Sequence, residues 1–124
     1  MTKYDNSYDP PEPVAEITLR NSITGKRIEN VFVLLDTGAD VSLLPLTAIE
    51  KLEIAPSDAK INLIGFDNSQ SVSEIYALQV IFLGKRLTGE YCATDSPVGI
   101  LGRDVLNELS IIFDGINLEW KEQK

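Results

Sequence analysis

The residue whose surroundings most clearly suggest chemistry is Asp36. It follows an apolar run of five residues at 31–35 and precedes Thr37 and Gly38, which suit a tight loop. A carboxylate at the end of a buried strand is costly to ionise, so such a residue is usually paired, hydrogen-bonded or used in a reaction. An aspartate that caps a turn is the alternative. The Asp-Thr-Gly tripeptide alone leaves both interpretations open.

The absence of histidine and the presence of one cysteine, Cys92, exclude several kinds of catalytic site. Ser-His-Asp and Cys-His pairs, histidine-ligated metal sites and thiolate zinc clusters cannot form within the chain. We therefore expect no metal and no cofactor, and we interpret Cys92 as a small buried hydrophobic residue. In an enzyme of this composition, carboxylates are the side chains expected to transfer protons.

Length and composition indicate one globular domain. The 124 residues are 44% hydrophobic and carry a net charge of −8, within the usual range for a folded protein. The negative charge argues against a nucleic-acid partner, because phosphates attract clustered lysine and arginine. No apolar run reaches the roughly 18 residues of a membrane span, and the first residues lack the apolar core of a signal peptide. We expect a cytoplasmic protein with no membrane partner.

The pattern along the chain is that of a small β protein. Residues 1–13 are rich in proline near their end and are expected to form a flexible tail ahead of one domain at 14–124. Short helices are expected after Pro45 and over 103–109. Apolar stretches separated by turn residues predict strands at 14–21, 26–35, 60–64, 72–83, 86–93 and 98–102, and a hairpin over 111–120. Such a series of short strands suggests a closed or partly closed barrel.

A second motif places Gly102 and Arg103 directly after an apolar strand. Together, residues 34–45 (LLDTGADVSLLP) and 99–106 (GILGRDVL) resemble the retropepsin-like aspartic proteases, the family of the retroviral proteases and their cellular relatives. The resemblance covers roughly residues 14–113. It implies a mostly β fold, a small closed barrel of the acid-protease type with one or two short helices. It also implies that the chain is one subunit of a homodimer.

The resemblance assigns roles to residues of both motifs. Asp36 would be the catalytic aspartate, Thr37 would hydrogen-bond across the dimer axis, and Gly38 would expose its backbone to the bound peptide. Asp40 would form an ion pair with Arg103 that braces the active-site loop, since arginine suits bidentate pairing with a carboxylate. A solvated arginine at the start of a helix is the alternative for Arg103.

The same resemblance implies a flap over residues 64–72, a hairpin that closes over substrate; an ordinary surface turn is the alternative. Retroviral flaps are rich in glycine, whereas this segment has only Gly65. The residues expected to bind substrate are Ala39, Asp40, Ile64, Gly65, Phe66, Pro97, Val98 and Ile100, with Leu43 as a further candidate for an apolar subsite wall. Residues 114–124 extend past the usual retroviral end, so the dimer contact is expected to differ. The hairpin at 111–120 is the candidate, with Trp120 either an interface anchor or simply half-buried.

The function that follows is that of an aspartic endopeptidase in which two Asp36 carboxylates, one from each subunit, activate a water molecule. One Asp-Thr-Gly in a chain of this length leaves a second copy as the source of the partner carboxylate. A catalytically weak dimerisation or peptide-binding module of the same fold is one alternative. An unrelated monomeric β-barrel with a coincidental motif is the other.

Overall fold

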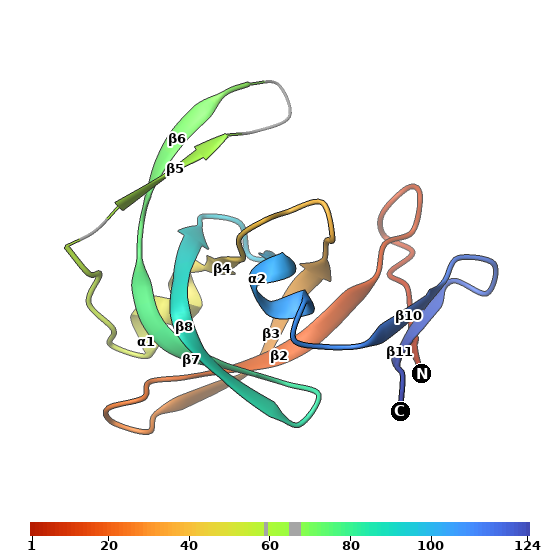
Figure 1. The fold of residues 1–124 in the computed structure, drawn as a ribbon, viewed down its shortest axis with the longest axis horizontal. Helices are drawn as coiled ribbons and strands as arrows, with labels where there is room; N and C mark the ends of the chain where they lie inside the picture. Colours follow the sequence, from red (N-terminus) through yellow and green to blue (C-terminus); the bar gives the residue numbers. More distant parts are fainter. Residues whose placement is uncertain (59, 65–67) are drawn as a thin grey trace.

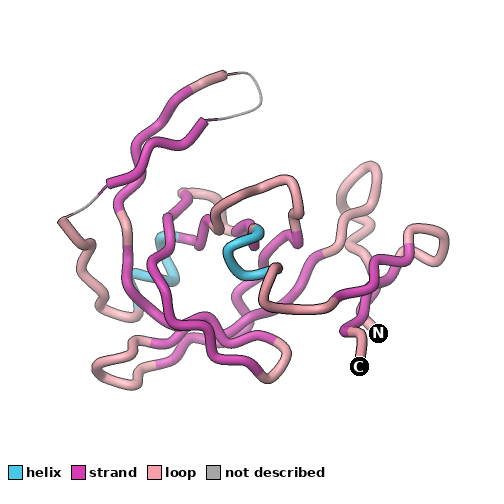
Figure 2. Tube along the Cα trace, in the orientation of Figure 1, coloured by secondary structure: helices cyan, strands magenta, loops and turns pink. Residues whose placement is uncertain are grey.

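The computed structural model describes residues 1–58, 60–64 and 68–124, and it shows a mostly β chain with short helices (Figure 1; Figure 2). The helices are α1 (Leu46–Lys51) and α2 (Arg103–Leu106). The strands are β1 (Thr2–Lys3), β2 (Val14–Arg20), β3 (Arg27–Leu35), β4 (Leu43–Pro45), β5 (Lys60–Ile64), β6 (Gln70–Glu74), β7 (Tyr76–Phe82), β8 (Lys85–Thr94), β9 (Gly99–Leu101), β10 (Ile111–Asp114) and β11 (Glu119–Glu122). In the described ranges no helix is long and apolar enough to span a bilayer.

A closed barrel forms the centre of the fold, with strand order β2-β3-β9-β4-β8-β7. The mostly β fold class and the closed barrel expected from the sequence are confirmed. Strand β9 pairs in parallel with β3 and antiparallel with β4, so it joins the two segments that carry the motifs. Alternate residues of a strand face opposite sides. Ala15, Ile17 and Leu19 of β2 therefore point inward and are at most 2% exposed.

Turn residues fix the hairpins of the barrel. Leu83 and Gly84 connect Phe82 to its partner Lys85, and both have positive φ, at 51° and 77°. A two-residue turn of this kind matches the twist of the strands it joins. At the other hairpin, Asn21 accepts hydrogen bonds from the next residues of the turn and donates from Nδ2 to the carbonyl oxygen of Leu52 at 3.0 Å. That bond attaches the β2–β3 turn to the end of α1.

The β5–β6 hairpin rises from the barrel at the upper left of Figure 1. It includes both ends of the segment 64–72 predicted as a flap, of which residues 65–67 lie outside the described part, so the flap stays a prediction. Its strands pair antiparallel from Lys60↔Glu74 to Ile64↔Gln70. The predicted continuous strand over 72–83 is divided at Ile75, whose carbonyl oxygen accepts a hydrogen bond from Ser57 N at 2.7 Å. The chain changes partner there, because β6 pairs with β5 whereas β7 pairs with β8.

The two ends of the chain form a separate small sheet with the order β1-β11-β10, at the right of Figure 1. Thr2 pairs with Trp120, and Asp5 forms a bridge with Glu12. The start of the chain is thus attached to the terminal hairpin and is not a free tail. The prolines at 10–13 restrict the backbone of that segment only. Thr2 and Lys3 lie before it, and they pair with the backbone at the edge of β11.

The terminal hairpin is joined to the barrel by Trp120, which is only 5% exposed. Its ring lies 5.8 Å from that of Phe82, and its Nε1 donates to the carbonyl oxygen of Val14 at 3.1 Å. Trp120 is therefore a core residue of the subunit, neither half-buried nor placed as an interface anchor. Cys92 is buried, as its interpretation as a small hydrophobic residue required.

Candidate active site

Asp36 lies directly after β3, in a tight turn that begins where the barrel strand ends. Its backbone N–H donates to the carbonyl oxygen of Leu101 at 3.0 Å, which continues the contact between β3 and β9. Its Oδ1 accepts a hydrogen bond from Gly38 N at 2.8 Å. A Cβ at position 38 would lie 3.1 Å from the same oxygen, so glycine allows this close approach of the backbone to the carboxylate.

The loop that carries Asp36 is held against the start of α2 by Arg103. The backbone N–H of Arg103 donates to the carbonyl oxygen of Ala39 at 2.8 Å, and its Nη1 donates to that of Thr37 at 2.7 Å. The expected ion pair between Arg103 and Asp40 is not formed; within the described ranges the ion pair present joins Lys26 to Glu53. The guanidinium is engaged by the Thr37 carbonyl, and Asp40 lines the cavity described below. Arg103 thus braces the loop through a carbonyl group and not through a carboxylate.

A second brace, which sequence reasoning missed, joins Ser42 to Asp104. Ser42 is fully buried, and its Oγ donates to Asp104 Oδ1 at 2.6 Å while accepting a hydrogen bond from Gly102 N at 2.9 Å. The backbone N–H of Ser42 donates to Asp104 Oδ2 at 3.0 Å. The sequence signal for this brace is a serine between two apolar residues, Val41 and Leu43, because a buried polar group is normally hydrogen-bonded.

A cavity of about 460 Å³ lies between this loop and the β5–β6 hairpin. The predicted site residues that line it are Asp36, Gly38, Ala39, Asp40, Leu43, Ile64 and Ile100. Its other lining residues, not identified from the sequence, are Val41, Ile61, Asn62, Leu63 and Ser69. The alternation of β5 could have identified Ile61 and Leu63, whose side chains share one face of that strand. The cavity therefore has a carboxylate floor, apolar walls and a β-hairpin roof.

Several predicted residues lie outside this cavity. Thr37 is exposed at the tip of the loop. Pro97 and Val98 belong to the connection between β8 and β9, where Val98 N donates to Ser96 Oγ at 3.2 Å. Gly65 and Phe66 fall outside the described residues. The roles of these residues in substrate binding or subunit contact stay predictions.

Two titratable groups near the loop, Cys92 and Tyr91, have raised pKa values. Burial raises the pKa of the Cys92 thiol, which disfavours the thiolate needed of a nucleophile. Burial, followed by the nearby charge of Asp104, raises the pKa of Tyr91 to about 12, so this phenol stays protonated. Among the described residues there is no group of three or more side chains placed to hold a metal ion.

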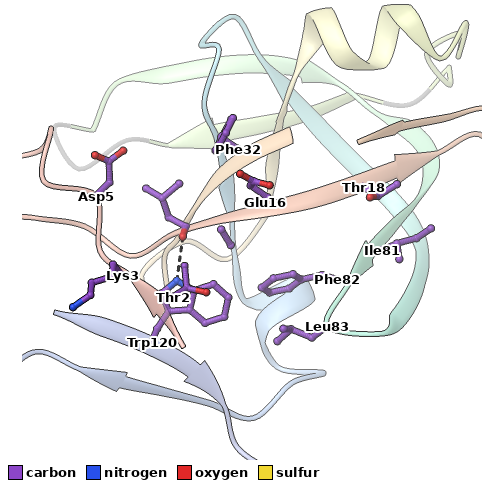
Figure 3. A pocket seen from close by; sticks show the side chains of 12 residues that line it. Thr2, Lys3, Asp5, Glu16, Thr18, Phe32, Ile81, Phe82, Leu83 and Trp120 are labelled. Carbon is purple, nitrogen blue, oxygen red and sulfur yellow. Dashed lines mark hydrogen bonds between the residues drawn. The ribbon is translucent and has the colours of Figure 1, made fainter. Parts of the chain in front are cut away.

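A larger cavity, of about 610 Å³, lies between the terminal sheet and the barrel (Figure 3). Phe32, Phe82 and Trp120 contribute to its lining, and the dashed line in Figure 3 marks the Trp120 hydrogen bond. None of the predicted site residues lies in it. The larger cavity also has carboxylates in its lining, Asp5 and Glu16, but the smaller one contains Asp36 and Gly38 of the Asp-Thr-Gly motif and is therefore the better candidate for the active site.

Comparison with known proteins agrees with this site. The retroviral aspartyl protease family matches residues 11–113, and the chain belongs to that family. This match excludes an unrelated barrel with a coincidental motif, and family and fold together support an aspartic protease. No curated protein matches the sequence.

Solved retroviral and foamy viral proteases share the fold. The EIAV protease complexed with the inhibitor HBY-793 is 24% identical, with a TM-score of 0.56 over 78% of this chain and 86% of that one. The Simian Foamy Virus (mac) protease is 14% identical, with a TM-score of 0.52 over 76% and 91%. A foamy viral protease-reverse transcriptase in complex with double-stranded DNA is 14% identical, with a TM-score of 0.52 over 75% of this chain and 15% of that chain.

Proposed function

We propose that the protein is an aspartic endopeptidase that works as a homodimer, with one Asp36 from each subunit in a shared active site. The observation that carries the proposal is the position of Asp36 on the floor of a cavity roofed by the β5–β6 hairpin. A peptide in extended conformation fits between such a floor and roof, where it can pair with strand edges.

The chemistry needs two carboxylates close together. Like charges at short distance cannot both ionise easily, so the pair holds one proton between its two members. The ionised member accepts a proton from water, and the resulting oxygen attacks the amide carbonyl. The protonated member donates to the developing oxyanion, and a proton then passes to the leaving nitrogen as the C–N bond breaks. No covalent intermediate forms, and the two carboxylates titrate as a pair.

The terminal sheet supports a contact between the two subunits. Strand β10 is an edge strand in the order β1-β11-β10, and its Ile112 and Phe113 are 37% and 38% exposed. An unpaired edge with exposed apolar side chains is a surface on which a second strand can pair. We place the subunit contact at β10, as the extended C-terminus suggested. Thr37, Pro97 and Val98, which lie outside the cavity of one subunit, would then face substrate or partner in the dimer.

Cleavage of an unbiased peptide library between about pH 4 and 7, with sedimentation of the same samples, tests this function. The wild type should cleave, and the dimeric Asp36→Asn variant should not, because it lacks the ionisable pair. Asp58→Asn, an exposed aspartate outside the cavity, is the matched control and should cleave like the wild type. A dimeric wild type that cleaves nothing would favour a peptide-binding module.

Mixing the wild type with Asp36→Asn tests whether the site is shared. If the subunits exchange freely, an equal amount of variant should lower the activity of a fixed amount of wild type to about one half, since mixed dimers carry one carboxylate. Unchanged activity would show that each subunit works alone.

Ile112→Lys tests the subunit contact and should yield inactive monomers, whereas Ile23→Lys, on the exposed turn after β2, should leave dimer and activity intact. A dimeric Ile112→Lys protein would place the contact elsewhere.

A further inference from the structure

A second cavity, of about 390 Å³, adjoins the candidate active site. It shares Leu43 and Leu63 with the cavity at Asp36, so the two hollows meet at a common wall below the β5–β6 hairpin. Leu46 of α1 and Val72 of β6 extend the apolar wall away from Asp36. A peptide that extends along the active-site cavity past Leu43 and Leu63 would bring one of its side chains to this second cavity.

The polar rim of the second cavity is acidic. Glu74 and Asp95 both line it and are exposed, and no lysine or arginine is among the described residues of the lining. Lys60 is the cross-strand partner of Glu74 but forms no ion pair with it; in the described part of the chain, Lys26–Glu53 is the ion pair present. The rim thus carries two carboxylates, neither of which forms an ion pair within the described residues.

Tyr76 holds one of the two rim carboxylates in place. Its hydroxyl donates to Glu74 Oε2 at 3.1 Å, which orients that carboxylate beside the cavity. Burial, then this hydrogen bond, and then the charges of Glu74 and Glu50 raise the pKa of Tyr76. Glu50 is not part of the lining, and its charge is the smallest of these contributions to the shift.

We infer that this cavity binds a lysine or arginine side chain of the peptide substrate. Both side chains combine a long apolar stem with a charged tip, and they bury the stem along apolar surface while the tip stays at the rim. An apolar wall ending in Glu74 and Asp95 matches that form. The inference rests on the proposed endopeptidase function, and it names the substrate class of the same site.

The two-fold symmetry of the proposed dimer makes the inference more specific. Each subunit would contribute one copy of the cavity, so the two copies would lie on opposite sides of the scissile bond. The preference for a basic residue should therefore appear on both the N-terminal and the C-terminal side of the cleaved bond. A single specificity pocket in an asymmetric enzyme would give a preference on one side.

The test compares two sets of peptides that differ at the positions expected to reach this cavity on either side of the scissile bond. One set carries lysine there and the other carries norleucine, a residue that keeps the apolar stem of lysine and lacks its charge. For the wild type we expect kcat/KM to be about 1.5- to fivefold higher for each lysine, the range typical of exposed charge pairs. Glu74→Gln combined with Asp95→Asn should abolish the difference. The matched control, Glu16→Gln with Asp58→Asn, removes the same charge from exposed sites outside the cavity and should retain it.

Binding of the same peptides to the Asp36→Asn protein separates this inference from the proposed function. A lysine preference in binding without cleavage by the wild type would support the cavity and contradict the endopeptidase. Equal binding of the two peptides, or a lysine preference that persists in the Glu74→Gln/Asp95→Asn variant, would overturn the inference even if the wild type cleaves. A preference confined to one side of the scissile bond would overturn its symmetric form.

Discussion

Replacing Ser42 with alanine tests how strongly the loop that carries Asp36 depends on the brace to Asp104. The Ser42 Oγ is fully buried and takes part in two hydrogen bonds, at 2.6 Å to Asp104 Oδ1 and at 2.9 Å from Gly102 N. The substitution removes one oxygen atom and adds no volume, so steric effects are small. Its cost should come almost entirely from the lost hydrogen bonds.

The magnitude follows from the two partners that are left behind. The N–H of Gly102 becomes a buried donor without an acceptor, which costs about 1–3 kcal/mol. The hydrogen bond to the charged Asp104 carboxylate contributes about 1.5–3 kcal/mol, although Asp104 is exposed and water can replace part of it. Because one side chain makes both bonds the two costs do not add fully, and we expect Ser42→Ala to lower the free energy of unfolding by about 3 kcal/mol.

Urea unfolding at one fixed protein concentration is the appropriate assay, since the stability of the proposed dimer would depend on concentration. Ser22→Ala is the matched control: Ser22 is exposed in the β2–β3 turn, and its loss should change the unfolding free energy by less than about 0.5 kcal/mol. A loss below about 1 kcal/mol for Ser42→Ala would refute the reasoning, because it would show that water or a small shift satisfies Gly102 N. A double-mutant cycle with Asp104→Ala should give a coupling of about 1–2 kcal/mol, and strict additivity would show that the brace is not energetically important.

Three further predictions concern the same framework. The pKa of Tyr91 is raised to about 12, above the value near 10 of an unfolded tyrosine. Its contribution to stability is therefore present below about pH 10 and is lost between about pH 10 and 12. Tyr91→Phe should remove this alkaline loss of stability in urea unfolding, and an unchanged pH profile would contradict the prediction. In Gly102→Ala the new Cβ would lie 2.8 Å from the backbone oxygens of Ala39 and Val41, which should cost about 1–3 kcal/mol in stability and lower the kcat of the proposed protease; wild-type stability and kcat would show that the loop can move aside. Trp120→Phe removes the hydrogen bond to Val14 and should cost about 1 kcal/mol in thermal denaturation; an unchanged Tm would show that the bond adds nothing to stability.

The barrel could be predicted from the sequence because its signals are local. Alternation in β2, the apolar end of β3 and the turn residues near Gly84 each specify structure within a few neighbouring residues. The position of Asp36 followed from the same signals, since the strand before it and the glycine after it define the loop. The two motifs then identified the family, which the match over residues 11–113 confirmed.

The contacts between distant segments could not be predicted in the same way. Both Asp40 and Asp104 lie near Arg103 in the fold, and the sequence does not show which carboxylate turns inward. In the structure Asp104 reaches Ser42, 62 positions away, while Asp40 lines the cavity. Which carboxylate forms the hydrogen bond depends on side-chain orientation. A rotation about one side-chain bond decides whether an aspartate forms such a bond or lines the cavity. The flap tip and the roles of Gly65 and Phe66 stay predictions.

The single subunit has its described buried polar groups paired but has one Asp-Thr-Gly carboxylate, so a second copy would supply chemistry and not folding. In the described part of the chain, every buried side-chain nitrogen or oxygen has a hydrogen-bond partner, and Trp120 closes the terminal sheet against the barrel within one chain. A buried polar group left without a partner would cost free energy that a contact with another subunit could offset, and none is found among the described residues. The deficit of the single chain is chemical instead, because the Asp-Thr-Gly motif provides one carboxylate where the proposed reaction requires two. Loss of the dimer should therefore abolish catalysis while leaving the barrel folded. For this reason Ile112→Lys, which should separate the subunits without disturbing the core, is more informative about the shared site than a core mutation.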